Sequence, residues 1–286
     1  MKLSETNKAW ILLTPALLFL SLPAYGLFSA IWTSLHENGS FTTKHYRTLF
    51  QQETFWESIG YSVRITLLST VLSLVLGLLI TRAFSPFIQS TKGKLSIWLP
   101  MLFPHFVWGY IVLLLFEQSG LISHLLVEMG LISSTSSFPI ITNDQNGIGI
   151  ILTYVGKETP FVVLMLLPIY AKQQDGYKDL VQTLGGGKWA AFKDAEWPWV
   201  SPVLLEAGII LFAFILSAYE VPFLLGATFP EMISVLTYDW FYSGDWNERP
   251  LAFAAMIITS VLIGIMSFIA FSAMNRKRML LTKGQG

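Results

Sequence analysis

The sequence predicts an all-α integral membrane protein with six transmembrane helices and both termini in the cytoplasm. Three observations carry this prediction: the composition, the long apolar segments and the distribution of positive charge. Of the 286 residues, 53% are hydrophobic and only 13% are charged. Soluble domains carry about 25% charged residues, so the composition indicates a chain that lies largely in lipid.

Six apolar segments are long enough to cross a bilayer, which takes about 20 helical residues. We expect a single transmembrane domain over residues 1–286, with a polar loop at 172–198 and spans near residues 9–32, 59–81, 95–116, 147–171, 199–226 and 252–274. The first segment exceeds the apolar part of a signal peptide and lacks a convincing cleavage site, which indicates an uncleaved span.

Lysine and arginine are distributed unequally between the two sides that these spans define. Thirteen of the 18 lie on the side of the N-terminus, and only Lys44, Arg47 and Arg249 lie on the opposite side. Arg64 and Lys157 fall inside predicted spans. Because cytoplasmic loops are enriched in lysine and arginine, both termini and the 172–198 loop are expected to be cytoplasmic.

The loop contains the pattern of two short helices joined by glycines. Tyr177, Leu180, Val181 and Leu184 have the spacing of one apolar helical face. Gly185 follows where a helix end favours a left-handed residue. A second helix is expected to carry Trp189 and Phe192, with Pro198 as the next boundary. Apolar faces exposed to water need a partner, so the loop is interpreted as a docking element.

Motifs typical of enzymes do not fit this sequence. Gly185-Gly186-Gly187-Lys188 lacks the first glycine of a phosphate-binding loop, because Gln182 stands at that position, and Trp189 replaces its serine or threonine. The four histidines are scattered, and the chain has no cysteine. His105, inside the third span, is interpreted as a buried, hydrogen-bonded histidine, with a proton relay as the alternative. We expect no catalytic residue and no metal site.

The loop resembles the EAA loop of permease subunits of ATP-binding-cassette (ABC) importers with the MetI-like fold. Asp179 stands at the family's glutamate, Gly185 at its glycine and Pro198 at its final proline. Further matches are Thr183-Leu184, Lys188-Trp189 and Ala191-Phe192. The departures are Leu180 and Val181, where the family has two alanines, and Trp197, where it has leucine.

Other segments are similar to the polyamine, iron and thiamine branch of these permeases. They are the span with Pro100 and Pro104, the stretch Gly120-Leu121-Ile122, and residues 218–226. The resemblance implies a pore formed with a second permease subunit, a different chain in this branch. It also implies a cytoplasmic ABC ATPase dimer docked on residues 177–198 of the loop and an extracytoplasmic substrate-binding protein. ATP and magnesium would be bound by the ATPase, and this chain would hold no cofactor.

The resemblance further implies that the ATPase is contacted by ten residues of the loop: Asp179, Leu180, Val181, Thr183, Leu184, Gly185, Lys188, Trp189, Phe192 and Pro198. Lys157, Glu158 and Glu220 lie inside predicted spans, where charged side chains face protein or water. They are candidates for the translocation path, and pairing between helices is an equal alternative. A polyamine-like cation is the expected solute, since the branch and the scarcity of outer basic residues favour it. Thiamine, ferric iron, phosphonate or an oxyanion are the alternatives within the same mechanism.

Two other classes of function remain open at this stage. A secondary transporter or channel would work without an ATPase, and internal inverted repeats would favour it; none is evident in the sequence. A membrane scaffold that does not transport would use the loop only to hold a soluble partner.

Overall fold

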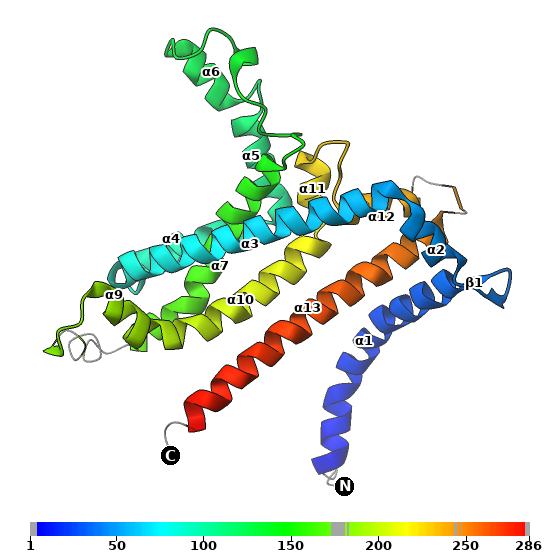
Figure 1. Ribbon diagram of the computed structural model, residues 1–286, viewed down its shortest axis with the longest axis horizontal. Coiled ribbons are helices and arrows are strands. Elements are labelled where there is room, and N and C mark those ends of the chain that lie inside the picture. Colours follow the sequence, from blue (N-terminus) through cyan, green and yellow to red (C-terminus); the bar gives the residue numbers. More distant parts are fainter. Residues whose placement is uncertain (1–4, 173–180, 182, 243–244, 247, 284–286) are drawn as a thin grey trace. The chain divides into compact units, whose positions relative to one another are not determined.

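The computed structural model describes residues 5–172, 181, 183–242, 245–246 and 248–283 (Figure 1). Its contacts divide the chain into two compact units. One unit comprises Met1–Trp56 and Leu236–Val261, and the other comprises Glu57–Val235 and Leu262–Gly286.

The described part of the chain contains six helical stretches that are long and apolar enough to cross a membrane, which confirms the predicted number. They are Leu12–Leu35, Glu53–Ile88, His105–Glu128, Ile148–Ala171, Lys188–Ser217 and Arg249–Ser272. The predicted all-α class is confirmed as well: the described strands are only two residues each, β1 (His36–Glu37) and β2 (Ser40–Phe41), paired antiparallel.

In the first unit, α1 (Glu5–Leu35) leads into the β1–β2 hairpin and then into the amphipathic α2 (Lys44–Gln51). The buried Ser34 hydroxyl lies 2.8 Å from the Tyr46 hydroxyl and links the end of α1 to α2. Large apolar side chains along α1 are exposed, as expected for a helix that contacts lipid. Three helices run across the boundary between the units: α3 (Glu53–Ile88), α12 (Ile233–Tyr242) and α13 (Arg249–Lys283).

The third predicted span is not one helix, which corrects the expectation for residues 95–116. It consists of α4 (Thr91–Leu102) and α5 (His105–Phe116), separated by Phe103 and Pro104. Phe103 is extended, as a residue before proline prefers, and Pro104 has no N–H to bond the carbonyl of Pro100. The helix therefore ends, and a new one begins after the proline.

The fifth predicted span, 199–226, is broken in the same way. It comprises α10 (Trp197–Ser217) and α11 (Glu220–Leu225). Pro222 has no N–H for the carbonyl of Ala218, and the Ser234 hydroxyl donates to that carbonyl instead, at 2.7 Å. The break directs the chain into α11. The other helices that the structure describes in this unit are α6 (Leu121–Glu128), η1 (Thr135–Ser137), α7 (Ile148–Lys172), α9 (Lys188–Ala190) and the π-helical η2 (Ala191–Glu196).

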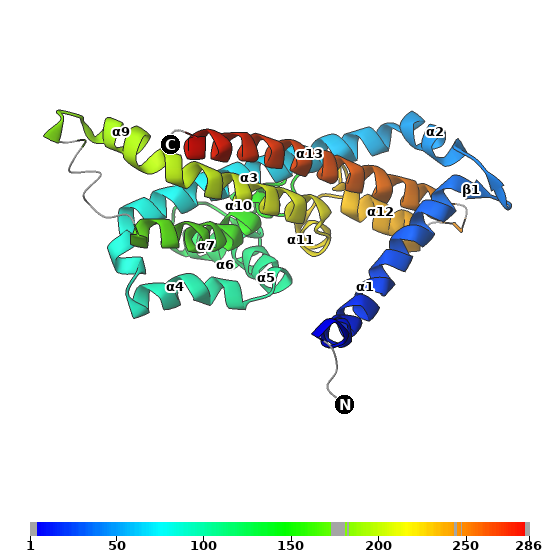
Figure 2. The same cartoon turned by 90° about the horizontal axis from the view of Figure 1, so that it is seen from below.

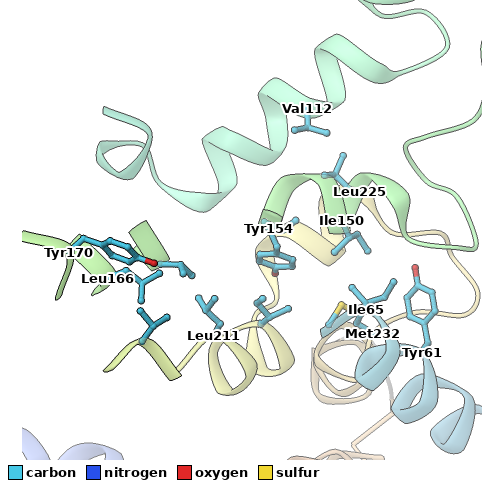
Figure 3. Close-up of a cluster of buried hydrophobic side chains, with 14 residues drawn as sticks. Tyr61, Ile65, Val112, Ile150, Tyr154, Leu166, Tyr170, Leu211, Leu225 and Met232 are labelled. Carbon is cyan, nitrogen blue, oxygen red and sulfur yellow. The ribbon is translucent and has the colours of Figure 1, made fainter. Parts of the chain in front are cut away.

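The centre of the second unit is α7, which packs against α4, α5, α10 and α11. Figure 2 shows α7 between α4 and α10. Buried apolar side chains follow α7 from Ile150 through Tyr154 to Leu166, and partners from the surrounding helices cover them (Figure 3). On the α3 side, a Cβ added at Gly77 would lie 2.6 Å from the Cβ of Val162, so only glycine allows this approach of the two helices.

Candidate functional site

The loop predicted to dock a partner contains the expected helix end at Gly185. Asp179 and Leu180 lie outside the described residues, whereas Val181 is helical. Gly185 has φ +84°, and the N–H of Gly186 donates to the carbonyl of Val181 at 2.8 Å. This bond and the left-handed residue before it form a Schellman motif. The prediction of a left-handed residue at Gly185 is confirmed.

Apolar side chains on both sides of this turn are exposed. The side chain of Leu184, before the glycines, is 79% exposed, and that of Trp189, after them, is 73% exposed. Thr183 and Lys188 are exposed beside them, while Val181 is half-buried. An exposed leucine and tryptophan around a rigid turn form a surface that a partner protein can cover.

Pro198 does not end a helix, which corrects the boundary expected there. The helical chain runs without interruption from Lys188 to Ser217, through the π-helical turn η2. The N–H of Trp197 donates to the carbonyl of Phe192, five residues before it. This wider turn accommodates a proline that would otherwise clash with the preceding turn. The second predicted short helix is therefore the first part of the fifth span.

Three helices meet at Glu196, at the end of η2. Its side chain is 3% exposed, and its Oε2 accepts a bond from Nε of Arg82 in α3 at 3.1 Å. The Tyr170 hydroxyl in α7 donates to the same oxygen at 3.2 Å. The Arg82 guanidinium also lies over the ring of Phe192, 4.6 Å from its centroid. Phe192, a predicted docking residue, is thus half-buried against α3.

Sequence reasoning missed Arg82, Tyr170 and Glu196, because each lies at the edge of an apolar run and belongs to no recognised motif. One signal was available. Glu196 directly precedes the apolar run of the fifth span, and Arg82 lies at the corresponding edge of the second. Opposite charges at the same predicted membrane face are suited to pair.

The second group of predicted residues lies at the break between α4 and α5. The ammonium of Lys157 donates to the carbonyl of Pro100 at 2.9 Å, of Met101 at 3.1 Å and of Phe103 at 2.6 Å. These three bonds use all three donors of the ammonium. A cation at the C-terminal end of α4 also complements the helix dipole. This geometry favours pairing between helices for Lys157.

Glu158, the next residue of α7, contacts the helix on the other side of the break. Its Oε1 lies 2.7 Å from Nε2 of His105, the first residue of α5. The side chain of Glu158 is 9% exposed and that of His105 is 30% exposed. The hydrogen bond expected for His105 is confirmed, whereas the side chain is half-buried and not buried as expected. A carboxylate at a helix N-terminus is favoured by the dipole, so Lys157 and Glu158 match the two helix ends with opposite charges.

Glu220 lies apart from this pair, at the start of α11, and is exposed. The Tyr154 hydroxyl is buried and has no hydrogen-bond partner in the part of the chain described. Phe214 of α10 packs edge-on against Tyr154 and also contacts His105, at centroid distances of 6.4 Å and 4.6 Å. The described residues contain no group of three or more histidine and acidic side chains that could hold a metal ion.

No family model matches the chain. Among curated proteins it is 27% identical over 269 residues to the trehalose/maltose transport system permease protein MalF of Thermococcus litoralis, covering 88% of this chain and 87% of that protein. It is 25% identical to the molybdenum transport system permease protein ModB of Azotobacter vinelandii, covering 71% and 89% of the two chains. It is also 25% identical to the inner membrane ABC transporter permease protein YnjC of Escherichia coli, with 77% of this chain aligned. That alignment spans only 41% of YnjC.

The solved structures decide the fold. A chain of a bacterial ABC transporter that imports the acidic polysaccharide alginate superposes with a TM-score of 0.73 at 19% identity, covering 94% of this chain and 95% of that one. This chain has the MetI-like fold of ABC importer permeases. It is a multi-pass membrane protein, as its six apolar helical stretches and its permease relatives indicate. The loop around Gly185 lies between the helical stretches Ile148–Ala171 and Lys188–Ser217.

Proposed function

We propose that this chain is a pore-forming permease subunit of an ATP-driven importer. A cytoplasmic ABC ATPase dimer docks on the loop at 177–198, and a second permease subunit, a different chain, completes the pore. An extracytoplasmic binding protein delivers the solute. This chain itself carries no ATP site and no catalytic residue.

The observation that carries this proposal is the exposed apolar surface around the left-handed Gly185. Leu184 and Trp189 are exposed on either side of a turn that a Schellman bond holds in one conformation. After the turn, Phe192 and Glu196 both contact Arg82 of α3 and so connect this part of the loop to a spanning helix. A rigid surface of this kind suits transmission of movement from a docked partner to the spans. The permease relatives and the alginate importer support the same function.

The binding protein is supported by a related structure. A bacterial alginate ABC transporter solved with its pentasaccharide-bound periplasmic protein matches this chain with a TM-score of 0.70 at 20% identity, covering 92% of both chains. By analogy, we propose that this chain receives its solute from a protein of the same kind on the outer side.

Glu158 and Glu220 are proposed to face the translocation path, where their carboxylates would ease the passage of a cation. Lys157 is the third residue predicted for the translocation path. We propose that its three bonds to carbonyl groups position α4 beside this path. Replacing each glutamate with glutamine removes the charge and keeps the size. Uptake that is unchanged in both variants would remove these carboxylates from the path.

For the solute, we propose a polyamine-like cation. The sequence favours a polyamine-like cation, but the relatives above are named for trehalose, maltose and molybdenum, and so lend no support to a polyamine. Uptake of radiolabelled spermidine, maltose and molybdate by proteoliposomes with the complete complex separates these classes. We expect spermidine to enter in an ATP-dependent manner, and uptake of only a sugar or an oxyanion would contradict the polyamine assignment.

In the decisive experiment, this chain is purified from its native membrane by an affinity tag, and the proteins that co-purify with it are identified. We expect an ABC ATPase and a second permease, and ATP hydrolysis by the complex that vanadate inhibits. A chain that purifies without an ATPase and takes up solute along an ion gradient would instead be a secondary transporter or channel. A complex with a soluble partner but without ATP hydrolysis or uptake would be a membrane scaffold.

A further inference from the structure

We propose that Glu196 is the positioning residue through which movement of the docking loop passes to α3 and α7. The inference rests on the proposed function, and it names the residues that link the loop to the membrane-spanning helices. These residues lie outside the set that the sequence predicted.

The first observation is the convergence of three helices on one buried oxygen atom. Oε2 of Glu196 accepts bonds from Nε of Arg82 and from the hydroxyl of Tyr170. The three residues come from η2, α3 and α7, and Glu196 is separated from Arg82 by 114 positions in the sequence. At 3% exposure, the carboxylate is stabilised by these partners, because a buried charge is strongly disfavoured without compensation. A movement of η2 that left Arg82 and Tyr170 behind would break both bonds.

The second observation is a continuous series of contacts from the exposed surface to this cluster. The ring of Trp189 lies 5.7 Å from that of Phe192, centroid to centroid. Phe192 in turn lies under the Arg82 guanidinium, which bonds Glu196. A protein that covers the exposed Trp189 is therefore connected, through Trp189 and Phe192, to the ion pair between Arg82 and Glu196.

The third observation is the shape of the turn that carries these groups. Residues 191–196 form a π-helical turn, and Ala191 and Ala195 on its inner face are buried. The small alanines allow the turn to lie close to neighbouring helices. Phe192 and Glu196 of this wider turn both contact the same residue, Arg82. Single π-turns inside α-helices are frequent at functional sites. Here the turn supplies two contacts between the described part of the loop and α3.

The absence of cysteine from the chain makes a direct distance measurement practical. Spin labels are attached to cysteines introduced at Lys193 in η2 and Phe87 near the end of α3, both of which are exposed. Pulsed electron paramagnetic resonance then measures the distance in the complex purified with its ATPase, first without nucleotide and then after trapping with ATP and vanadate. With native Glu196, we expect one narrow distance distribution that is the same in both states, because the loop and α3 move together.

In the Glu196→Gln variant, we expect the Lys193–Phe87 distribution to broaden and to differ between the two nucleotide states. Tyr170→Phe removes a single hydroxyl donor and is expected to broaden the distribution less. If the Glu196→Gln complex does not assemble, Tyr170→Phe tests the same contact. Asp194→Asn is the matched control: it removes an exposed carboxylate from the same turn and is expected to leave the distribution narrow.

Narrow and state-independent distances in assembled Glu196→Gln and Tyr170→Phe complexes would overturn the inference. Broadening by Asp194→Asn equal to that by Glu196→Gln would overturn it too, since a general loss of charge would then explain the effect. Failure of the proposed function has a separate signature: the native chain would purify without an ATPase, and no vanadate-trapped state would form.

Discussion

Nε2 of His105 and Oε1 of Glu158 lie 2.7 Å apart, across the junction where α5 begins against α7. The carboxylate is 9% exposed, so the imidazole is the partner that compensates for its removal from water. The contact also places the charge of Glu158 at the N-terminus of α5, where the helix dipole favours it. The pair thus fixes the position of α5 relative to the central helix.

His105→Ala is expected to lower the stability of the protein by about 1–3 kcal/mol, because it leaves a buried acceptor without its donor. Thermal unfolding of the purified protein in detergent, followed by circular dichroism, measures the change. His124→Ala, at an exposed histidine of α6, serves as the control and is expected to leave the melting temperature unchanged. Equal shifts in the two variants would mean that the pair does not stabilise the fold.

Lys157→Met keeps most of the apolar stem and removes the ammonium from the three carbonyls at the end of α4. We expect destabilisation of about 1–3 kcal/mol, since unsatisfied backbone carbonyls in an apolar surrounding are costly. Lys193→Met, at an exposed lysine, is the matched control for the change in side-chain type. A melting temperature of Lys157→Met that equals that of the native protein would contradict the capping role.

Gly185→Val is expected to weaken association with the ATPase, because a branched side chain is strained at φ +84° although the surrounding space is open. Gly185→Asn should restore most of the association, since asparagine tolerates the left-handed conformation. Gly187→Ala is the matched control, because Gly187 has φ −79° and open space. Co-purification of the ATPase measures the effect, and undiminished co-purification with Gly185→Val would refute the prediction.

Gly77→Leu is expected to destabilise the protein by about 1–3 kcal/mol, the usual range for overpacking a filled interior. The new side chain would have to displace Val162, which lies where its Cβ would be. Gly264→Leu in α13 meets no atom within 4 Å and is the control for adding the same side chain to a helix. Similar melting temperatures of the two variants would show that α3 can move away from α7 without penalty.

The all-α class and the six spans were predictable because burial in lipid imposes a length and an apolar composition on each span. The left-handed conformation of Gly185 was predictable because a helix that ends at a glycine can adopt few backbone conformations. The breaks at Pro104 and Pro222 were not recognised, because an apolar run looks the same whether or not the helix is continuous. Arg82 and Glu196 were missed because a pair 114 positions apart leaves no local pattern.

Pro198 shows the opposite error. A proline was interpreted as a boundary, yet the helix continues through it by widening one turn. The sequence shows only that proline lacks an N–H and clashes with the preceding turn of a helix. The tertiary contacts of Phe192 and Glu196 determine whether the helix ends there or widens. Among the predicted translocation residues, the sequence indicated that Lys157 and Glu158 need partners, but which helix supplies them could be learned only from the fold.

The capping of α4 by Lys157 also has a consequence for how the chain is made. During synthesis, α4 and α5 enter the membrane before α7 has been translated, and the carbonyls of Pro100, Met101 and Phe103 then have no ammonium beside them. Unsatisfied carbonyls are costly in hydrocarbon, so we expect these two helices to stay next to water or the insertion machinery until α7 arrives. On this expectation, a residue of the fourth span completes the integration of the third.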